Sequence, residues 1–156
     1  MKTLLLSTIA LSLGLTACMP ATTSMSSSSA SAPMSAKLTT FTGTVSATNE
    51  VPAIISAVNG TVMLVLNEDL KTASVSGMVM GLSGAPAAQH IHVAFKGANG
   101  PVLKPLSSTV SGTNMYTISG GFNLTDAEII DLKAKKFYFN IHTAANPGGE
   151  GRAQLE

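Results

Sequence analysis

Apolar and polar positions alternate along most of the chain after residue 40, which is the period-two pattern of half-buried β-strands. Gly, Pro, Asn and Asp interrupt this pattern at intervals, as they do in turns between strands. The pattern predicts five strands before the C-terminal segment, over residues 41–47, 61–66, 73–80, 89–95 and 115–122. In the fourth strand, Ile91, Val93 and Phe95 share the core face, and His90 and His92 point away from it.

Residues 137–156 predict a hairpin, in which a strand, a Pro-Gly-Gly loop and a second strand follow one another. Residues that pair directly in an antiparallel hairpin lie on the same face of the sheet. Keeping both apolar sets on the core face therefore fixes the register. On the opposite face the predicted pairs are Tyr138 with Gln154, Asn140 with Arg152, and His142 with Glu150.

A short helix is predicted just before this hairpin, over residues 126–134. Thr125 and Glu128 have the spacing of a capping box, in which the two side chains bond reciprocally to the first turn. Ile129, Ile130 and Leu132 are its candidate core contacts. Together the elements predict an all-β fold, an antiparallel β-sandwich or Greek-key barrel with one short helix before the C-terminal hairpin.

The first part of the chain is expected to be a targeting segment. Residues 1–17 have the layout of a secretory signal peptide, and the apolar run is too short to span a bilayer as a helix. Leu15-Thr16-Ala17-Cys18 resembles a bacterial lipobox. The resemblance implies cleavage before Cys18 and acylation of that residue, and several acyl chains on one residue anchor stably. Residues 18–36, rich in Ser, Ala and Thr, then read as a flexible tether, and residues 37–156 as one domain.

Several short motifs occur in order along this domain. They are Asn49-Glu50-Val51-Pro52, Gln89-His90-Ile91-His92, Gly100-Pro101-Val102, Leu124-Thr125 with Glu128, Asn140-Ile141-His142-Thr143, Asn146-Pro147-Gly148-Gly149-Glu150 and Arg152. The ordered set resembles the CHRD domain, a module named after chordin and also found alone in many secreted bacterial proteins. In chordin the module belongs to an extracellular antagonist of bone morphogenetic proteins. For single-domain bacterial members the resemblance implies no established activity.

All three histidines fall on the outward face of predicted strands. If the two strands that carry them are neighbours, His90, His92 and His142 converge, with Glu150 beside them. Imidazole and carboxylate donors suit Zn²⁺ or Cu²⁺. The alternative is a polar hairpin that needs no cofactor, because outward polar residues are expected in any half-buried strand. Its structural members would be Asn140, Asn146, Gly148, Gly149 and Arg152.

Composition and motifs limit the classes of function that can be expected. Charged residues make up 11% of the chain and the formal net charge is +1, without a basic run, so nucleic-acid binding is not expected. No nucleophile elbow, phosphate loop or dinucleotide fingerprint occurs, so an enzyme is not expected either. The sequence thus favours a non-enzymatic binding or structural module, held on the cell envelope by a lipid anchor and facing an envelope partner. Met19 after Cys18 favours the outer membrane in a cell that has one.

Overall fold

The strands form where polar and apolar residues alternate, and the helix forms at its capping box. The computed structural model describes residues 36–156. Their strands are β1 (Leu38–Ser46), β2 (Asn59–Asn67), β3 (Thr72–Met80), β4 (Pro86–Val93), β5 (Val102–Pro105), β6 (Ser107–Gly112), β7 (Met115–Asn123), β8 (Phe137–Thr143) and β9 (Gly151–Gln154). A 3₁₀ turn, η1 (Ala47–Asn49), follows β1, and the helix α1 (Asp126–Lys133) lies between β7 and β8.

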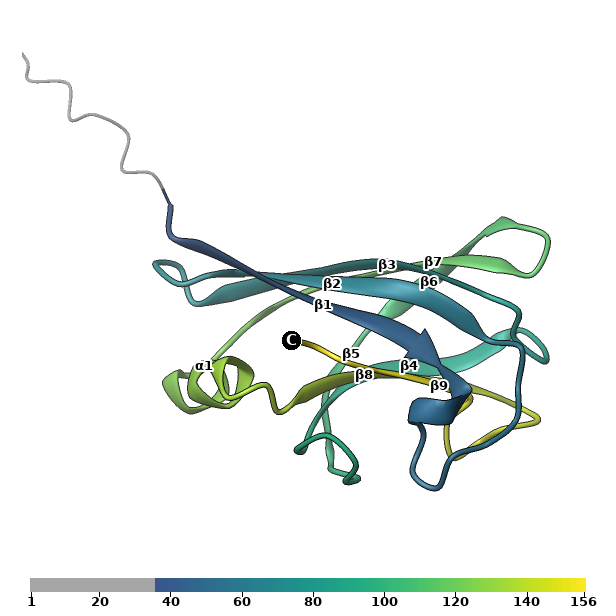
Figure 1. Ribbon diagram of the computed structural model, residues 1–156. Helices are drawn as coiled ribbons and strands as arrows, with labels where there is room; N and C mark the ends of the chain where they lie inside the picture. Colours follow the sequence, from purple (N-terminus) through teal and green to yellow (C-terminus); the bar gives the residue numbers. More distant parts are fainter. Residues whose placement is uncertain (1–35) are drawn as a thin grey trace, which may run out of the picture. The chain divides into compact units, whose positions relative to one another are not determined.

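All the strands belong to one antiparallel sheet, in the order β5-β4-β8-β9-β1-β2-β3-β7-β6. The sheet curls so that β1, β2, β3, β7 and β6 lie over β4, β5, β8 and β9 (Figure 1). The two edge strands, β5 and β6, follow one another in the chain, and the amide of Leu106 between them donates to the carbonyl oxygen of Gln89 in β4 at 3.0 Å. The fold is a nearly closed barrel or sandwich with one short helix, which confirms the predicted fold class.

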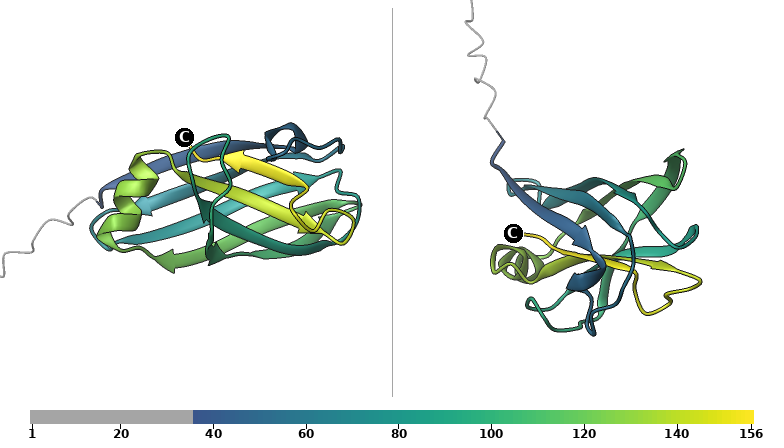
Figure 2. Two further views of the ribbon diagram at one scale, coloured as in Figure 1. Left: turned by 90° about the horizontal axis from the view of Figure 1, so that it is seen from below. Right: turned by 45° about the vertical axis from the view of Figure 1, so that its right-hand side comes forward.

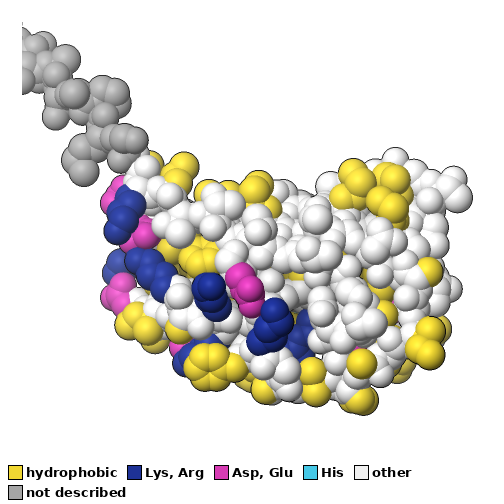
Figure 3. Space-filling model, in the orientation of Figure 1, with side chains coloured by type: hydrophobic (Ala, Val, Ile, Leu, Met, Phe, Trp, Pro, Cys, Tyr) yellow, Lys and Arg dark blue, Asp and Glu magenta, His cyan; other side chains and the backbone are white. Residues whose placement is uncertain are grey.

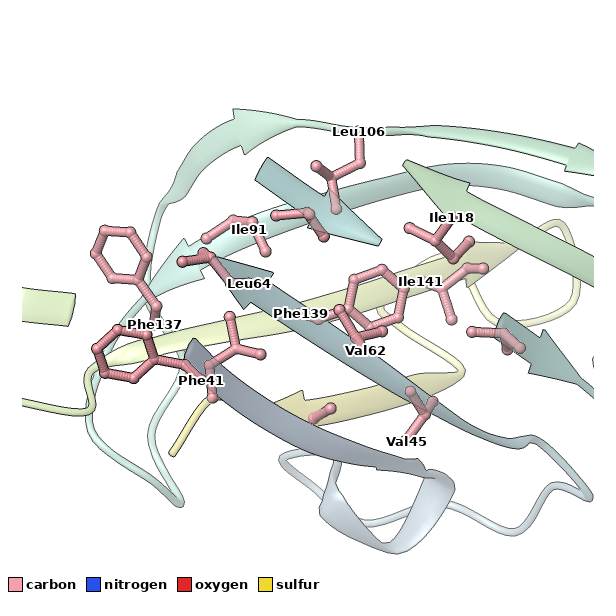
Figure 4. Packing of buried hydrophobic residues seen from close by; sticks show 14 of the residues in the cluster. Phe41, Val45, Val62, Leu64, Ile91, Leu106, Ile118, Phe137, Phe139 and Ile141 are labelled. Atoms are coloured by element: carbon pink, nitrogen blue, oxygen red, sulfur yellow. The ribbon is translucent and has the colours of Figure 1, made fainter. Parts of the chain in front are cut away.

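The core fills the space between the two layers. Its largest members include Leu64, Ile91, Phe137, Phe139 and Ile141, each with no exposed surface. Figure 4 shows these side chains meeting from β2, β4 and β8. The apolar half of each alternating strand therefore faces inward, as the period-two pattern predicts.

The predicted helix is confirmed, together with its cap. The Thr125 hydroxyl accepts a hydrogen bond from the Glu128 amide at 3.2 Å, and the Glu128 carboxylate accepts one from the Thr125 amide at 2.7 Å. The helix lies at one end of the barrel (Figure 2). Leu132 is fully buried and Ile129 partly, but Ile130 is 67% exposed. Ile130 as a core contact was therefore a wrong prediction, because the short helix turns only one narrow face to the barrel.

Two strand predictions also need correction. β4 ends at Val93, so Phe95 lies beyond the strand and is 62% exposed instead of facing the core. The ammonium group of Lys136 lies 4.9 Å from the centre of its ring. Neither β5 nor β6 has a counterpart among the predicted strands, and the mostly small polar residues of β6 give no alternation. β6 forms through pairing with β7 at the edge of the sheet.

Charged side chains gather near the end of the barrel that holds α1, and much of the remaining face in Figure 3 is uncharged. There the Glu68 carboxylate meets the ammonium groups of Lys133 at 2.7 Å and Lys37 at 2.9 Å. These ion pairs connect the helix to the turn between β2 and β3 and to the residue before β1. They are surface pairs, so each contributes little to stability.

Within residues 36–156, no helix is both long and apolar enough to cross a membrane. The predicted signal peptide, Cys18 and all but the last residue of the tether lie outside the described residues.

Candidate functional site

The two histidine-bearing strands are neighbours. β8 pairs with β4 on one side and β9 on the other, with His90 opposite Asn140 and His92 opposite Tyr138. On the β9 side, Asn140 pairs with Arg152, as the hairpin register predicts. The predicted pair Tyr138–Gln154 is present as well. Polar side chains from three adjacent strands thus share the outer face of the barrel wall.

This outer face is buried, although it points away from the core. Tyr138 and Arg152 are only 3% and 2% exposed, because the segment of residues 94–101, between β4 and β5, folds back over them. The Arg152 guanidinium lies 3.5 Å from the centre of the Tyr138 ring. It also donates hydrogen bonds to the Ala98 carbonyl at 2.6 Å and the Asn99 side-chain oxygen at 3.1 Å. Arg152 therefore fastens this segment, here called the covering loop, to the sheet.

The covering loop also reaches the histidines. The Nδ1 atom of His92 donates to the Gly100 carbonyl at 3.0 Å, and the Gly100 amide donates to the Tyr138 hydroxyl at 3.1 Å. The ring of His92 stacks on that of Tyr138, with centres 4.8 Å apart. His92 is consequently held in one orientation by a carbonyl on one edge and an aromatic face below.

His90, His92 and His142 form a compact cluster. One ring nitrogen from each histidine lies within 4.8 Å of the others. The ring centres are 5.4 Å apart for His90 and His142, 5.6 Å for His90 and His92, and 6.3 Å for His92 and His142. The sheet thus brings together donors that lie about fifty residues apart in the sequence.

Hydrogen bonds set the tautomers of two of these rings. A carbonyl oxygen can only accept, so Nδ1 of His92 carries a proton toward Gly100 and Nδ1 of His142 carries one toward Pro147, at 3.0 Å each. In the neutral ring, Nε2 then holds the free lone pair. Nε2 of both residues, and Nδ1 of His90, are buried and find no hydrogen-bond partner among the described residues. Each histidine therefore offers one unused donor nitrogen.

The surroundings of His90 and His92 favour the neutral form of these two rings. Burial lowers the pKa of His90 and of His92, and repulsion from the neighbouring histidines lowers it further. For His92, the hydrogen bond to Gly100 acts in the opposite direction without reversing the shift. A metal binds only the neutral ring, so this shift favours metal binding at neutral pH.

Glu150 does not join the cluster. Its carboxylate is fully buried and accepts four hydrogen bonds of 2.6–2.7 Å, from the Ser56 and Thr143 hydroxyls and from both the amide and the hydroxyl of Ser83. Burial alone would raise its pKa, but these bonds hold the pKa at about 2. The predicted position beside His142 is wrong because of a bulge. Glu150 donates its amide to the Ile141 carbonyl, while Gly151 is the register partner of Ile141.

The other predicted hairpin residues have structural contacts. The Asn146 backbone bonds to Thr143 across the loop, and its side chain donates to the Ser83 hydroxyl at 3.3 Å. Gly149 has a φ of 132°, and a Cβ there would lie 2.8 Å from the Asn140 side chain. Gly148 has open space around it.

Glu50 is a site residue that the alternation pattern does not reveal. It lies just after η1, is 8% exposed, and accepts a hydrogen bond from the Asn140 side chain at 2.7 Å. Burial raises its pKa to about 7, although the Asn140 bond and the Arg152 charge both lower it. The signal in the sequence is its place in the motif Asn49-Glu50-Val51-Pro52.

The CHRD domain family matches residues 41–155, a span that contains every strand of the barrel except the first residues of β1. The chain belongs to the CHRD domain family. This membership confirms the resemblance found in the sequence and indicates a binding or structural module. No curated protein matches the chain, and no solved structure does.

One groove of this CHRD domain adjoins the polar layer, since Glu50, Arg152 and Gln154 are among the residues that line it. It has a volume of about 1120 Å³ and is floored by Thr and Met side chains of β1, β2 and β3, among them Thr42, Thr61, Met63 and Met78. None of the three histidines lines it. Its lining shows no convergent set of unpartnered polar atoms, so the histidine cluster is the stronger candidate for a binding site.

Proposed function

We propose that this CHRD protein is a lipid-anchored module of the cell envelope that binds a transition metal ion, Zn²⁺ or Cu²⁺, through His90, His92 and His142. The observation that carries the proposal is the convergence of three donor nitrogens within 4.8 Å. Each of the three histidines also has one buried ring nitrogen without a hydrogen-bond partner among the described residues, and because buried polar atoms usually have a partner, these nitrogens support a bound ligand.

The distances suit a metal after a small adjustment. In a tetrahedral zinc site with Zn–N bonds of about 2.0–2.1 Å, the nitrogens are about 3.3 Å apart. Side-chain rotation can close the remaining gap without moving the strands. The tautomers support the same conclusion, since metal-bound histidines commonly donate the other ring nitrogen to a backbone carbonyl, as His92 and His142 do.

The donor set selects the class of metal. Three imidazoles without a carboxylate favour Zn²⁺ and Cu²⁺ over Ca²⁺ and Mg²⁺, which require oxygen ligands. The lipobox-like sequence ending at Cys18 supports a position outside the cytoplasm, where the module would meet metal ions and envelope proteins. The role is binding, and no catalytic step is part of the proposal.

The test is calorimetric titration of the purified, chelator-treated full chain with Zn²⁺ and with Cu²⁺. We expect one ion per chain, and an affinity at least about tenfold lower in each of His90→Ala, His92→Ala and His142→Ala, because each removes one of three bonds to the ion. Asp69→Asn, which changes an exposed carboxylate in the turn between β2 and β3, is the control and should bind like the unaltered chain.

A second readout separates lost binding from lost folding. An ion that binds only the folded state raises stability by RT ln(1 + [L]/Kd), or about 2.7 kcal/mol at a hundredfold excess over Kd. The unaltered chain should therefore melt at a higher temperature with the ion, and the histidine variants should not. A chain that takes up neither ion and melts at the same temperature with and without it would contradict the metal proposal. The polar layer would then be a purely structural network.

A further inference from the structure

Resting on the proposed metal site, we infer that the bound ion keeps its fourth coordination position for a donor from outside the chain, and that this donor is an anion. A carboxylate of a partner molecule and a small inorganic anion share this chemistry. The inference concerns the ligand of the metal, whereas the proposed function concerns the metal alone.

The first argument is that the chain has no fourth donor at this place. Among residues 36–156, the group of potential ligands contains the three histidines and no carboxylate or thiol. Glu150 is already saturated by four hydrogen bonds. Glu50 is occupied by the Asn140 side chain. Zinc sites with four protein ligands are structural and closed, whereas those with three keep an open position.

The second argument is access. The covering loop touches the cluster through His92, which is 8% exposed. His90 and His142 are both partly exposed, and His90 makes no hydrogen bond in the described part of the chain. The unused nitrogens of these rings are themselves buried, so an outside donor would reach the ion by a turn of His90, the ring that no hydrogen bond holds. His90 is free to turn while the ion and its ligand exchange, since only the other two rings are held by carbonyls.

The third argument is charge. Three neutral imidazoles leave the double positive charge of the ion uncompensated. The guanidinium of Arg152 brings a positive charge into the same polar layer, 3.5 Å from the centre of the Tyr138 ring on which His92 stacks. Glu50 accepts a hydrogen bond from Asn140 and is not among the potential ligands of the cluster, so it does not supply the missing negative charge. A negatively charged donor thus gains more at the fourth position than a neutral one.

The experiment uses Co²⁺, whose visible spectrum reports the number and geometry of its ligands. The full chain is loaded with Co²⁺ and titrated with sodium azide, and separately with imidazole as the neutral donor. We expect the bands to shift and saturate with azide, and azide to bind more tightly than imidazole. His142→Ala, loaded in the same way, should lose the original spectrum.

The outcomes distinguish the two proposals. A chain that shows no cobalt bands and binds no Co²⁺ contradicts the metal site itself. Cobalt bands that azide and imidazole leave unchanged mean that the ion is saturated by the protein, which overturns the open position. Imidazole binding as tightly as azide overturns the preference for an anion, while the open position stands.

Discussion

Two buried carboxyl groups lie near the C-terminal hairpin, and their pKa values are shifted in opposite directions. The pKa of Glu50 is raised and that of Glu150 is lowered, because their hydrogen-bond partners differ. Glu150 accepts four hydrogen bonds from hydroxyls and an amide, which stabilise its charged form. Glu50 accepts one bond from Asn140, which does not offset the cost of burying its charge. Net hydrogen bonding, not burial alone, decides the charge of a buried acid.

For Glu50 we predict a stability that falls as the pH rises. Its folded pKa of about 7 lies above the ordinary value of 4.5, so the folded chain holds a proton that the unfolded chain has lost between these values. The unfolding free energy should therefore drop by about 3 kcal/mol from pH 4.5 to pH 7.5 through this group. The lowered pKa values of His90 and His92 act in the opposite sense below pH 6.5.

Glu50→Gln isolates this contribution, because the amide keeps an acceptor for Asn140 but does not titrate. Urea unfolding of both proteins at several pH values measures it. The advantage of the variant should grow steadily from pH 4.5 to pH 7.5. Parallel stability curves for the two proteins would show that Glu50 is not the titrating group.

For Glu150 the sign is reversed. Its folded pKa of about 2 lies below 4.5, so its stabilisation is present above pH 4.5 and disappears as the pH falls toward 2. Glu150→Gln should lower the unfolding free energy by about 3 kcal/mol at pH 7, and by much less at pH 2.5. It should leave the metal stoichiometry unchanged. A Glu150→Gln chain that is folded but cannot bind Zn²⁺ would place Glu150 among the metal ligands after all.

At the scale of elements, the decisive feature is the covering loop over β8 and β9. It covers the outer face of these two strands, so that their polar side chains form a second buried layer. Arg152 holds the loop in place by two hydrogen bonds. The same loop supplies the carbonyl of Gly100 that orients His92. A change that makes the covering loop more mobile should therefore also change the orientation of the His92 ring.

Arg152→Met should release the loop, since it removes two hydrogen bonds and the contact with Tyr138 while keeping much of the side-chain volume. We expect faster amide exchange over residues 94–101 and Zn²⁺ binding weakened by about tenfold or more, as for the loss of other groups that orient a ligand. Lys96→Ala is the matched control within the loop, because Lys96 pairs only with Glu156 at the surface. Equal exchange in both variants would contradict the role of Arg152.

Except for β5 and β6, the strands and the helix could be predicted because alternation and capping are local. The hairpin register was right for Tyr138 and Asn140 for the same reason. The register failed at Glu150, because a bulge in a glycine-rich turn leaves no local signal of which way the next side chain points. Alternation also shows whether a side chain points toward the core or away from it. It does not show which other segment covers a side chain that points away. The burial of Arg152 and the contact of Glu50 with Asn140 depend on distant loops and could not be predicted.

At the scale of the whole molecule, the order of the strands in the sheet creates the site. β4 and β8 are separated in the sequence by β5, β6, β7 and α1, yet they pair directly. From the sequence, the three histidines could be expected to meet only if their two strands were neighbours. Whether they are neighbours could not be predicted, because strand order depends on long-range contacts. The span that matches the CHRD domain family, residues 41–155, includes both of these strands and all three histidines.

The proposed anchor is a prediction at the same scale. Cys18→Ala removes the thiol that the lipobox-like sequence would acylate. We expect the unaltered protein to fractionate with membranes and the variant to move to the soluble fraction, because a chain without acyl groups has no stable membrane anchor. Ser24→Ala, a change in the tether, is the control. A Cys18→Ala variant that remains with membranes would refute lipid anchoring.

The most direct measurement of the central claim is X-ray absorption spectroscopy of the full chain loaded with one equivalent of Zn²⁺. The structure predicts three imidazole nitrogens at about 2.0–2.1 Å, with the outer-shell scattering that imidazole rings produce. Loss of one ring from that shell in His90→Ala would identify this residue as a ligand. A first shell of oxygens alone, or of sulfur, would contradict a site built from His90, His92 and His142.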